Sequence, residues 1–282
     1  MTTLSIVIPT LNEEHSLPRT LSHLRALDPA PDEIVIADGG SSDATITIAA
    51  EMGGAMADEA GAQSASQTAS QTAPQTAPQT ASQTASQTMG QIPIRILTCP
   101  QPGRGPQINA GVGAAMGDIV CILHADSELP RDAIALMRAA MRDDRLALSS
   151  FLPRLVGEGG TRWGSSLHNV AKVWYAPLIG RPLAFARGVR LLFGDHAMFF
   201  RRADFAAIGG CDPRLAIMED ADLCLKFARL GRVRPLWRWV RTSDRRIAQL
   251  GSVRANIIYL KVCLLWAMGA RESLGDHYPE IR

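Results

Sequence analysis

Short apolar runs alternate with helical patterns through the first 126 residues of the chain. Runs rich in β-branched residues predict strands at LSIVIP (4–9), EIVIAD (33–38), IRILTC (94–99) and DIVCILHAD (118–126). Between them, helical patterns are predicted over 14–27, 44–52 and 106–116. This order predicts an α/β fold with a Rossmann-like, mostly parallel central sheet, flanked by helices and joined by right-handed crossovers.

A tetrapeptide repeat interrupts the alternation. Residues 65–88 read A-[S/P]-Q-T six times, without one large apolar side chain. Such a segment cannot bury enough surface to offset the entropy of ordering it, so we expect a disordered surface insertion over about 53–91. We therefore expect one domain over 1–232, interrupted by this insertion, and a C-terminal basic segment with a helical extension over 233–282.

An almost wholly apolar segment, NIIYLKVCLLWAMGA, occupies residues 256–270. It contains Lys261 and is shorter than the roughly 18 to 20 residues that a spanning helix needs. We expect a buried helix here; contact with a membrane surface is the alternative.

Composition narrows the class of protein. The formal net charge is +2, so the chain lacks the strongly basic character of a general nucleic-acid binder. Its five cysteines are scattered and never spaced as C-x-x-C, which argues against a disulfide framework or a zinc knuckle. No basic segment precedes the first apolar run, unlike in a signal peptide. We expect a cytoplasmic protein, with the inner face of the membrane as the alternative location.

Polar residues follow each predicted strand at its carboxyl end, and in a parallel sheet these ends meet at one rim where ligands bind. Arg104 stands between glycines at a helix start, where a phosphate would meet both the guanidinium and free backbone N–H groups. Asp38 precedes the residues that cap the next helix, so its carboxylate is available for a base imide or a ribose hydroxyl; a simple capped turn is the alternative. Gly39 lets the backbone turn tightly or approach a ligand. The other rim residues are Thr10, Asn12, Glu14, Asn109 and those from His124 to Glu128.

His124, Asp126 and Glu128 form a weak metal signal, which a polar strand end explains equally well. Their position beside Arg104 and Asp38 strengthens it, because a phosphate-binding site needs a dication. Mg²⁺ or Mn²⁺ is held by one or two carboxylates while nucleotide phosphates supply much of the remaining coordination. We expect Asp126 to be that carboxylate and His124 to contact the ribose.

Three carboxylates, Glu219, Asp220 and Asp222, begin a predicted helix. Acidic residues in a first turn stabilise the helix dipole, which explains the pattern without a function. Carboxylates this close also repel one another, and one that lies near a substrate acquires a raised pKa suited to a general base.

A basic stretch with two tryptophans, RVRPLWRWVRTSDRR, spans residues 232–246. Such a stretch is able to bind single-stranded nucleic acid. On a nearly neutral chain, an edge that faces pyrophosphate or a phosphorylated acceptor is the better interpretation.

Six motifs in order, VIPTLNEE, ADGGSSDAT, GRGPQINAG, LHADS, GDHAMFFRRADFAAIGG and MEDADL, resemble those of the family 2 glycosyltransferases, which have the glycosyltransferase-A fold. The resemblance covers about residues 4–232, apart from the repeat. LHADS, together with the later TSDRR, resembles the subgroup labelled selenodomain-associated or arsenosugar-biosynthesis transferases.

The resemblance implies a metal-dependent, inverting transfer of a sugar from a nucleotide-sugar donor, with a UDP-sugar favoured, to a hydroxyl of a small or lipid-linked acceptor. It implies Asp220 as the general base and Asp126 as the ligand of Mg²⁺ or Mn²⁺. Arg246 matches a pyrophosphate-facing arginine, although Ile247 stands where the family has tryptophan. The residues expected at the nucleotide are Pro9, Thr10, Asn12, Glu14, Asp38, Gly39, Arg104 and His124, and those expected at the pyrophosphate or acceptor are Arg245, Arg246 and Glu219.

Two alternatives stay open. The first is a non-catalytic sugar-nucleotide-binding protein, which is suggested by His124 in place of the first Asp of the D-x-D signature of the family. A nucleotidyltransferase shares the sheet but is expected to carry a Gly-rich, basic loop directly after the first strand, where this chain has PTLNEE.

Overall fold

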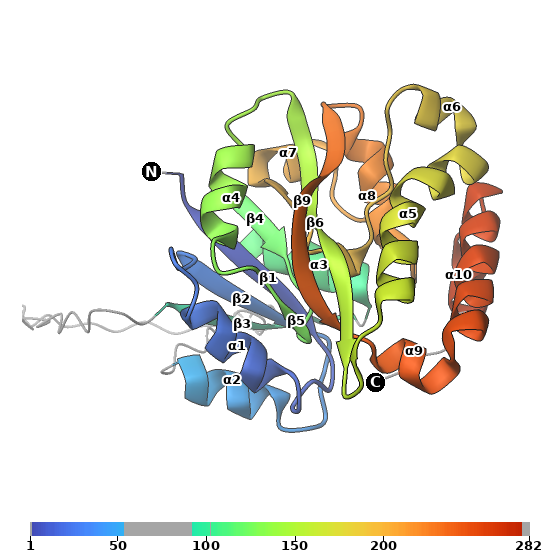
Figure 1. Cartoon of the computed structure of the whole chain (residues 1–282). Helices are drawn as coiled ribbons and strands as arrows, with labels where there is room; N and C mark the ends of the chain where they lie inside the picture. The colour runs from blue at the N-terminus through green and yellow to red at the C-terminus, as the bar shows by residue number, and fades with distance from the viewer. Residues whose placement is uncertain (1, 54–91, 102, 278–282) are drawn as a thin grey trace, which may run out of the picture.

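The computed structural model describes residues 2–53, 92–101 and 103–277. Its first half forms four parallel strands in the order β3-β2-β1-β4 (Figure 1). They are β1 (Leu4–Thr10), β2 (Glu33–Asp38), β3 (Ile94–Thr98) and β4 (Ile119–Ile122). The predicted α/β sheet is confirmed. The repeat at 65–88 lies outside the described residues.

The first three helices differ from the predicted ranges at their ends. They are α1 (Leu17–Arg25), α2 (Thr45–Gly53) and α3 (Arg104–Ala114). α1 begins three residues later than expected, with Pro18 in its first turn, where the fixed φ of proline suits a helix start. α3 begins two residues earlier, directly after Gly103, whose φ of 123° turns the chain into the helix.

The second half of the chain adds strands of mixed direction to the same sheet. β8 (Phe199–Arg201) lies antiparallel to β4 and to β6 (Leu146–Gly157), and β9 (Arg232–Ser243) runs parallel to β6. The short strands β5 (Ser127–Glu128) and β7 (Gly160–Thr161) pair with β9 and β6. The expected boundary after residue 232 therefore falls at the first residue of a sheet strand.

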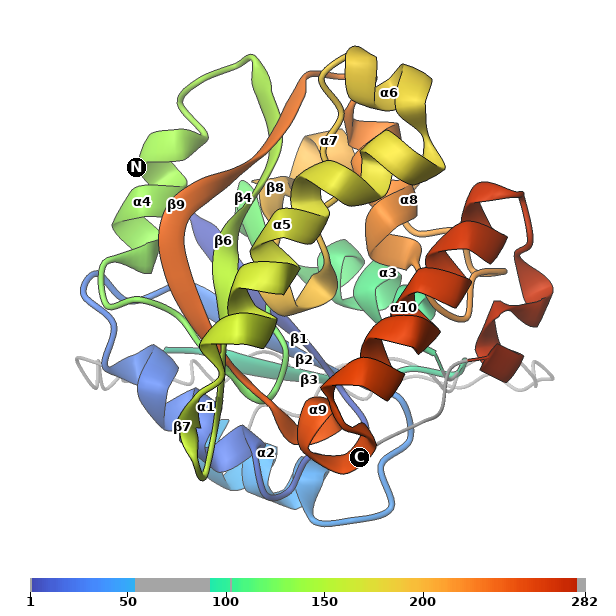
Figure 2. The same ribbon diagram turned by 45° about the vertical axis from the view of Figure 1, so that its right-hand side comes forward.

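Helices cover both faces of this sheet (Figures 1 and 2). One core cluster joins the sheet to α1, α2 and α4 (Ala133–Ala140), and the other joins it to α3, α5 (Trp163–Gly180), α7 (Arg202–Ala207), α8 (Glu219–Phe227) and α10 (Ser252–Ala267). Along β1, Ile6 and Ile8 belong to the first cluster and Val7 to the second, as strand alternation requires. Because β1 is buried on both faces, core packing on either side holds the residues at its carboxyl end in place.

The C-terminal region is helical. It contains α9 (Arg245–Leu250), α10 and the 3₁₀ segment η2 (Glu272–His277), while α6 (Pro182–Ala186) follows α5. α10 lies beside α5 at one side of the molecule (Figure 2). Full burial of this helix was the wrong expectation: Ala255, Val262 and Trp266 are buried, but a second apolar row is exposed. No helix in the described part of the chain is both long and apolar enough to cross a bilayer.

Candidate functional site

A cavity of about 1240 Å³ opens at the carboxyl ends of β1 and β4. α5 and α10 supply one wall, and the segments 213–220 and 242–247 supply others. Most of the residues expected at the site line it, namely Pro9, Thr10, Arg104, His124, Asp126, Glu219, Asp220, Arg245 and Arg246. Four do not, namely Asn12, Glu14, Asp38 and Gly39.

Asp38 and Asn12 shape the loops behind the cavity. Asp38 is buried at the end of β2, where its carboxylate accepts hydrogen bonds from the hydroxyls of Thr10 and Ser41 and from two backbone N–H groups of its own turn. The expectation that local structure leaves this carboxylate unused is wrong. Asn12 has a φ of 56°, and its Oδ1 accepts the N–H of Ser42 at 2.8 Å. Together these bonds join the loops that follow β1 and β2.

Gly39 has a packing role in the same place. A Cβ on Gly39 would lie 2.9 Å from Nε2 of Gln107, a side chain of α3. That Nε2 donates to the carbonyls of Thr10 and Ala37 at 2.6 and 2.8 Å. The absence of a side chain at Gly39 therefore lets α3 bind the ends of two strands.

Two adjacent glutamates after the left-handed residue Asn12 point in different directions. Oε2 of Glu14 accepts the N–H of Ala44 at 2.9 Å, next to the start of α2, which is a helix-capping role. Glu13 lines the cavity, and its Oε2 is buried with no hydrogen-bond partner among the described residues. Glu13 was not predicted as a site residue, because the sequence does not show which of the two adjacent glutamates faces the cavity.

Glu13 and Asp126 make one side of the cavity acidic. Burial, followed by the charge of Glu13, raises the pKa of Asp126 to about 6. An Arg245 nitrogen lies 3.2 Å from Oε1 of Glu13 and 3.7 Å from Oδ2 of Asp126. The orphaned Glu13 oxygen and the repulsion between the carboxylates fit a dication whose coordination is completed by phosphates. No group of three or more His, Cys, Asp or Glu side chains within 2–53, 92–101 and 103–277 is arranged to hold a metal ion by itself.

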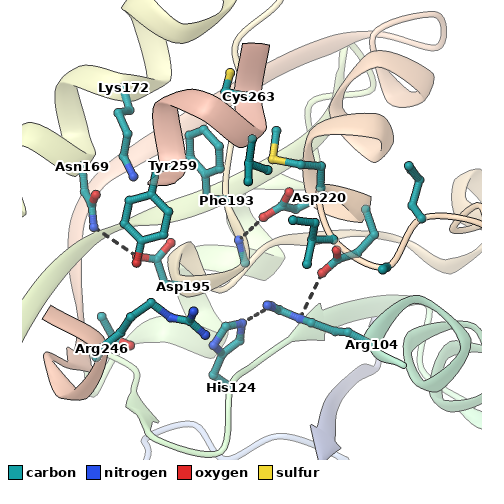
Figure 3. Close-up of a pocket in the computed structure, with 18 of the residues that line it drawn as sticks. Arg104, His124, Asn169, Lys172, Phe193, Asp195, Asp220, Arg246, Tyr259 and Cys263 are labelled. Atoms are coloured by element: carbon teal, nitrogen blue, oxygen red, sulfur yellow. Dashed lines mark hydrogen bonds and ion pairs between the residues drawn. The ribbon is translucent and has the colours of Figure 1, made fainter. Parts of the chain in front are cut away.

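Arg104 connects two parts of the cavity wall. Its Nε lies 3.2 Å from Oε1 of the buried Glu219, and its outer nitrogen donates to Nε2 of His124 (Figure 3). Burial, and next the charge of Arg104, lower the pKa of His124, so the ring is neutral and accepts this bond. A Cβ on Gly194 would collide with the Arg104 guanidinium, so this arrangement needs a glycine at that position.

Asp220 lies in the first turn of α8 and faces the cavity (Figure 3). Its Oδ2 accepts the N–H of Gly194 at 2.8 Å, and its Oδ1 accepts the N–H of Ala221 at 2.6 Å. Burial, and next the charge of Glu219, raise the pKa of Asp220 to about 7. Met218, directly before the helix, has a φ of 70°, a strained conformation that clusters at functional sites. A carboxyl group with this pKa on a cavity wall is suited to take a proton near neutral pH.

The opposite wall contains polar residues that the sequence analysis did not single out. The ammonium group of Lys172 lies 5.0 Å from the ring centroid of Phe193 and 4.7 Å from that of Tyr259. Nδ2 of Asn169 donates to Oδ2 of Asp195 at 3.2 Å. Figure 3 shows Lys172 and Asn169 across the cavity from α3. Because α5, η1 (Gly194–His196) and α10 meet only in three dimensions, no local motif marks this group.

The arginines of β9 pair with carboxylates of the chain itself. The pairs are Arg232 with Asp143, Arg238 with Asp132 and Arg241 with Glu128. The prediction of an anion-facing edge is therefore wrong for these three arginines, because each already pairs with a carboxylate of the chain; pairing of β9 with β5 accounts for the contact of Arg241 with Glu128. Arg245 and Arg246, which follow the strand, do line the cavity.

The chain matches the model of a protein family described as Glycosyl transferase family 2 over residues 5–55 and 77–209, which is more than half of its length. No curated protein sequence matches it.

Solved structures share the fold at low sequence identity. The mannosyltransferase PcManGT from Pyrobaculum calidifontis, in complex with GDP-Man and Mn²⁺, is 16% identical with a TM-score of 0.65; the match covers 100% of this chain and 66% of that one. Glucosyl-3-phosphoglycerate synthase from Mycobacterium tuberculosis, with Mn²⁺, UDP and glucosyl-3-phosphoglycerate, is 19% identical with a TM-score of 0.55, covering 96% and 82%. TarS 1–349 from S. aureus, with UDP-GlcNAc, is 13% identical with a TM-score of 0.53, covering 97% and 69%.

Proposed function

The chain belongs to glycosyl transferase family 2 and is a nucleotide-sugar-dependent glycosyltransferase, and we propose that it is metal-dependent, inverts the transferred sugar and prefers a UDP-sugar. The preference is supported by UDP and UDP-GlcNAc in two of the similar structures, while the mannosyltransferase holds GDP-Man. The LHADS and TSDRR motifs support the selenodomain-associated or arsenosugar-biosynthesis subgroup. The acceptor is a hydroxyl of a small or lipid-linked molecule.

One observation carries this proposal: Asp220, with its raised pKa, lines the same cavity as Asp126, Arg245 and Arg246. An inverting transfer needs a base on one side of the sugar and a stabilised leaving group on the other. Asp220 is the base, and the two arginines receive the diphosphate.

The reaction requires one bond to form and one to break. The acceptor oxygen bonds to the anomeric carbon, the bond from that carbon to the diphosphate oxygen breaks, and Asp220 takes the hydroxyl proton. The electron pair of the broken bond leaves with the nucleoside diphosphate. Attack from the side of Asp220, opposite the leaving group, inverts the configuration of the sugar.

Asp126 and Glu13 would hold Mg²⁺ or Mn²⁺ together with the donor phosphates. When bound, the ion supplies positive charge that offsets the charge of the leaving diphosphate. Arg245, which already contacts both carboxylates, adds a fixed positive charge on this side.

The other rim residues bind or support the nucleotide. Pro9, Thr10, Arg104 and His124 line the cavity and contact the donor. Asn12, Glu14, Asp38 and Gly39 act from behind it, because their hydrogen bonds and packing set the loops that carry the lining residues. Glu219 acts through its ion pair with Arg104.

Replacement of Asp220→Asn tests the proposal. We expect kcat to fall by about 10² to 10⁴, the usual contribution of a general base, with the Kd for UDP almost unchanged. Asp222→Asn is the matched control, because Asp222 lies two residues further along α8, pairs with Lys226 and does not line the cavity. NMR of the product gives its anomeric configuration, and retention would exclude the role given to Asp220.

A further inference from the structure

The outer surface of α10 is apolar. Val253, Ile257, Leu260, Leu264 and Met268 recur every three or four residues, which places them on one side of the helix. They are 75%, 62%, 49%, 41% and 76% exposed. The opposite side packs into the core, so α10 is apolar on both sides. An exposed apolar row on a helix whose other side is already packed is typical of an interaction surface.

The charged residues near this apolar row indicate what kind of partner covers it. The segments 159–194 and 245–271, which contain α5, α6, α9 and α10, hold ten Lys and Arg residues and no Asp or Glu. Three of the ten, Arg162, Arg245 and Arg271, pair with carboxylates outside these segments, and η2, which packs against α10, contributes Glu272 and Asp276 to the sequence of this region. Arg254 and Lys261 flank the apolar row on α10 and are exposed. Neither forms an ion pair with a carboxylate of the described residues. Arg254 and Lys261 are therefore the cations that this side of α10 offers to a negatively charged partner.

We propose that this docking face, made of the outer row of α10 with Arg254 and Lys261, binds the surface of an anionic lipid bilayer. An interfacial helix inserts its apolar residues at the level of the headgroups, while flanking cations contact anionic lipids. Both requirements are met on one helix.

A second copy of the chain fits this face less well. A twofold interface brings the same surface patch of each copy together, so the patch must be complementary to itself. Two copies of α10 would bring Arg254 and Lys261 of both together without carboxylates from these segments to balance them. The charge that attracts an anionic bilayer thus opposes self-association.

The docking face is continuous with the cavity. Val253, Ile257, Leu260 and Leu264 belong to the outer row and also line the cavity that contains Asp220, together with Ile179 of α5. An amphipathic acceptor is thereby able to pass from a bilayer along an apolar path to the base. This last consequence rests on the proposed function, whereas the docking itself does not.

Flotation of the full chain with vesicles tests the docking. We expect the protein to float with vesicles of phosphatidylcholine and phosphatidylglycerol in a ratio of two to one, to bind phosphatidylcholine alone much more weakly, and to dissociate as salt is raised. Each cation near such a surface contributes about fivefold in affinity, so Arg254→Gln with Lys261→Gln should lower binding by about twentyfold or more. Ile257→Asp with Met268→Asp should lower it by at least about tenfold.

Met116→Asp is the matched control. Met116 is 69% exposed, lies between α3 and β4, and is outside the docking face, so this variant should bind like the wild type. Unfolding temperatures of all variants should stay close to the wild-type value, because the changed side chains are exposed. Failure of the wild type to float, or equal loss in the Met116 variant, would overturn the proposal. A dimer seen by light scattering and dissociated by Ile257→Asp would assign the face to a second copy instead.

Discussion

The backbone N–H of Gly194 donates to Oδ2 of Asp220 at 2.8 Å, and the same glycine makes room for the guanidinium of Arg104. One residue thus positions the candidate base and permits the ion pair beside it. A methyl group at this position must displace Arg104 or move the segment that carries the N–H.

We therefore expect Gly194→Ala to lower the free energy of unfolding by about 1–3 kcal/mol, as overpacked sites do, and to weaken UDP binding. Urea denaturation and calorimetric titration measure the two effects. Gly164→Ala is the control, because a Cβ there meets no atom within 4 Å. Equal stability and affinity of the two variants would contradict the packing described for Gly194.

The rate of transfer should depend on the ionisation of Asp220. Its pKa is raised to about 7, and a general base works only when it is deprotonated. The kcat/KM for the donor, which reports the free protein, should therefore rise with pH through about 7 and level off above it, falling about tenfold per pH unit on the acid side. The rise in kcat should lie at higher pH, because an anionic donor beside Arg104 raises the pKa of Asp220 further. A rate that does not change between about pH 5 and 8 would show that the ionisation of Asp220 does not control the transfer.

The same shift affects stability with a definite sign. A carboxyl group whose pKa is higher in the folded state than in the unfolded chain binds its proton more tightly when folded, so its ionisation costs stability as pH rises. The gain in unfolding free energy from Asp220→Asn should grow between about pH 4 and pH 7 and stay constant above that range. Denaturant titrations of both proteins at several pH values measure it.

Glu13 and Glu14 offer a matched pair of substitutions. Glu13→Gln should raise the Mn²⁺ concentration needed for half-maximal activity by about tenfold or more, because its buried carboxylate faces the proposed ion. Glu14→Gln should leave this concentration unchanged and cost at most about 1 kcal/mol of stability through the cap of α2. Chelation with EDTA should abolish activity in both variants and in the wild type. Identical metal dependence in the two variants would remove Glu13 from the site.

Substitutions at Arg246 and Arg241 compare anion binding in the cavity with anion binding on β9, the strand before it. Arg246→Gln should weaken UDP binding by about tenfold or more, since a hydrogen bond to a charged group contributes roughly 1.5–3 kcal/mol. Arg241→Gln should change it less than twofold, because that side chain pairs with Glu128 at the surface, an interaction worth at most about 1 kcal/mol. Calorimetric titration with UDP compares them, and a larger effect at Arg241 would restore the anion-binding role to β9.

Two features of the structure were predicted from the sequence, because they depend only on hydrophobic periodicity and on the order of the strands. The four parallel strands follow from apolar runs such as Ile6 to Ile8, and the meeting of Arg104, His124 and Asp126 follows because loops after parallel strands share one rim. These inferences need only local patterns and the topology of an α/β sheet.

Other features depend on long-range geometry. The direction of Glu13 depends on the path of the loop after β1, in which Asn12 has a φ of 56°, and the pairing of Arg241 depends on the register of β9 against β5. The position of Lys172 over Tyr259 requires α5 and α10 to be neighbours. The sequence pattern of α10 is apolar all round, which is equally compatible with burial and with an exposed row.

Arg104 lies between His124 and Glu219, and its charge couples the binding of the nucleotide to the protonation of Asp220. Its positive charge lowers the pKa of Asp220, and an anionic donor close to this guanidinium opposes that effect. Linkage is reciprocal, so a donor that raises the proton affinity of Asp220 is itself bound more tightly when Asp220 carries the proton. Arrival of the donor thereby raises the pKa of the base that the acceptor meets, so that the charge of one substrate tunes the group that acts on the other.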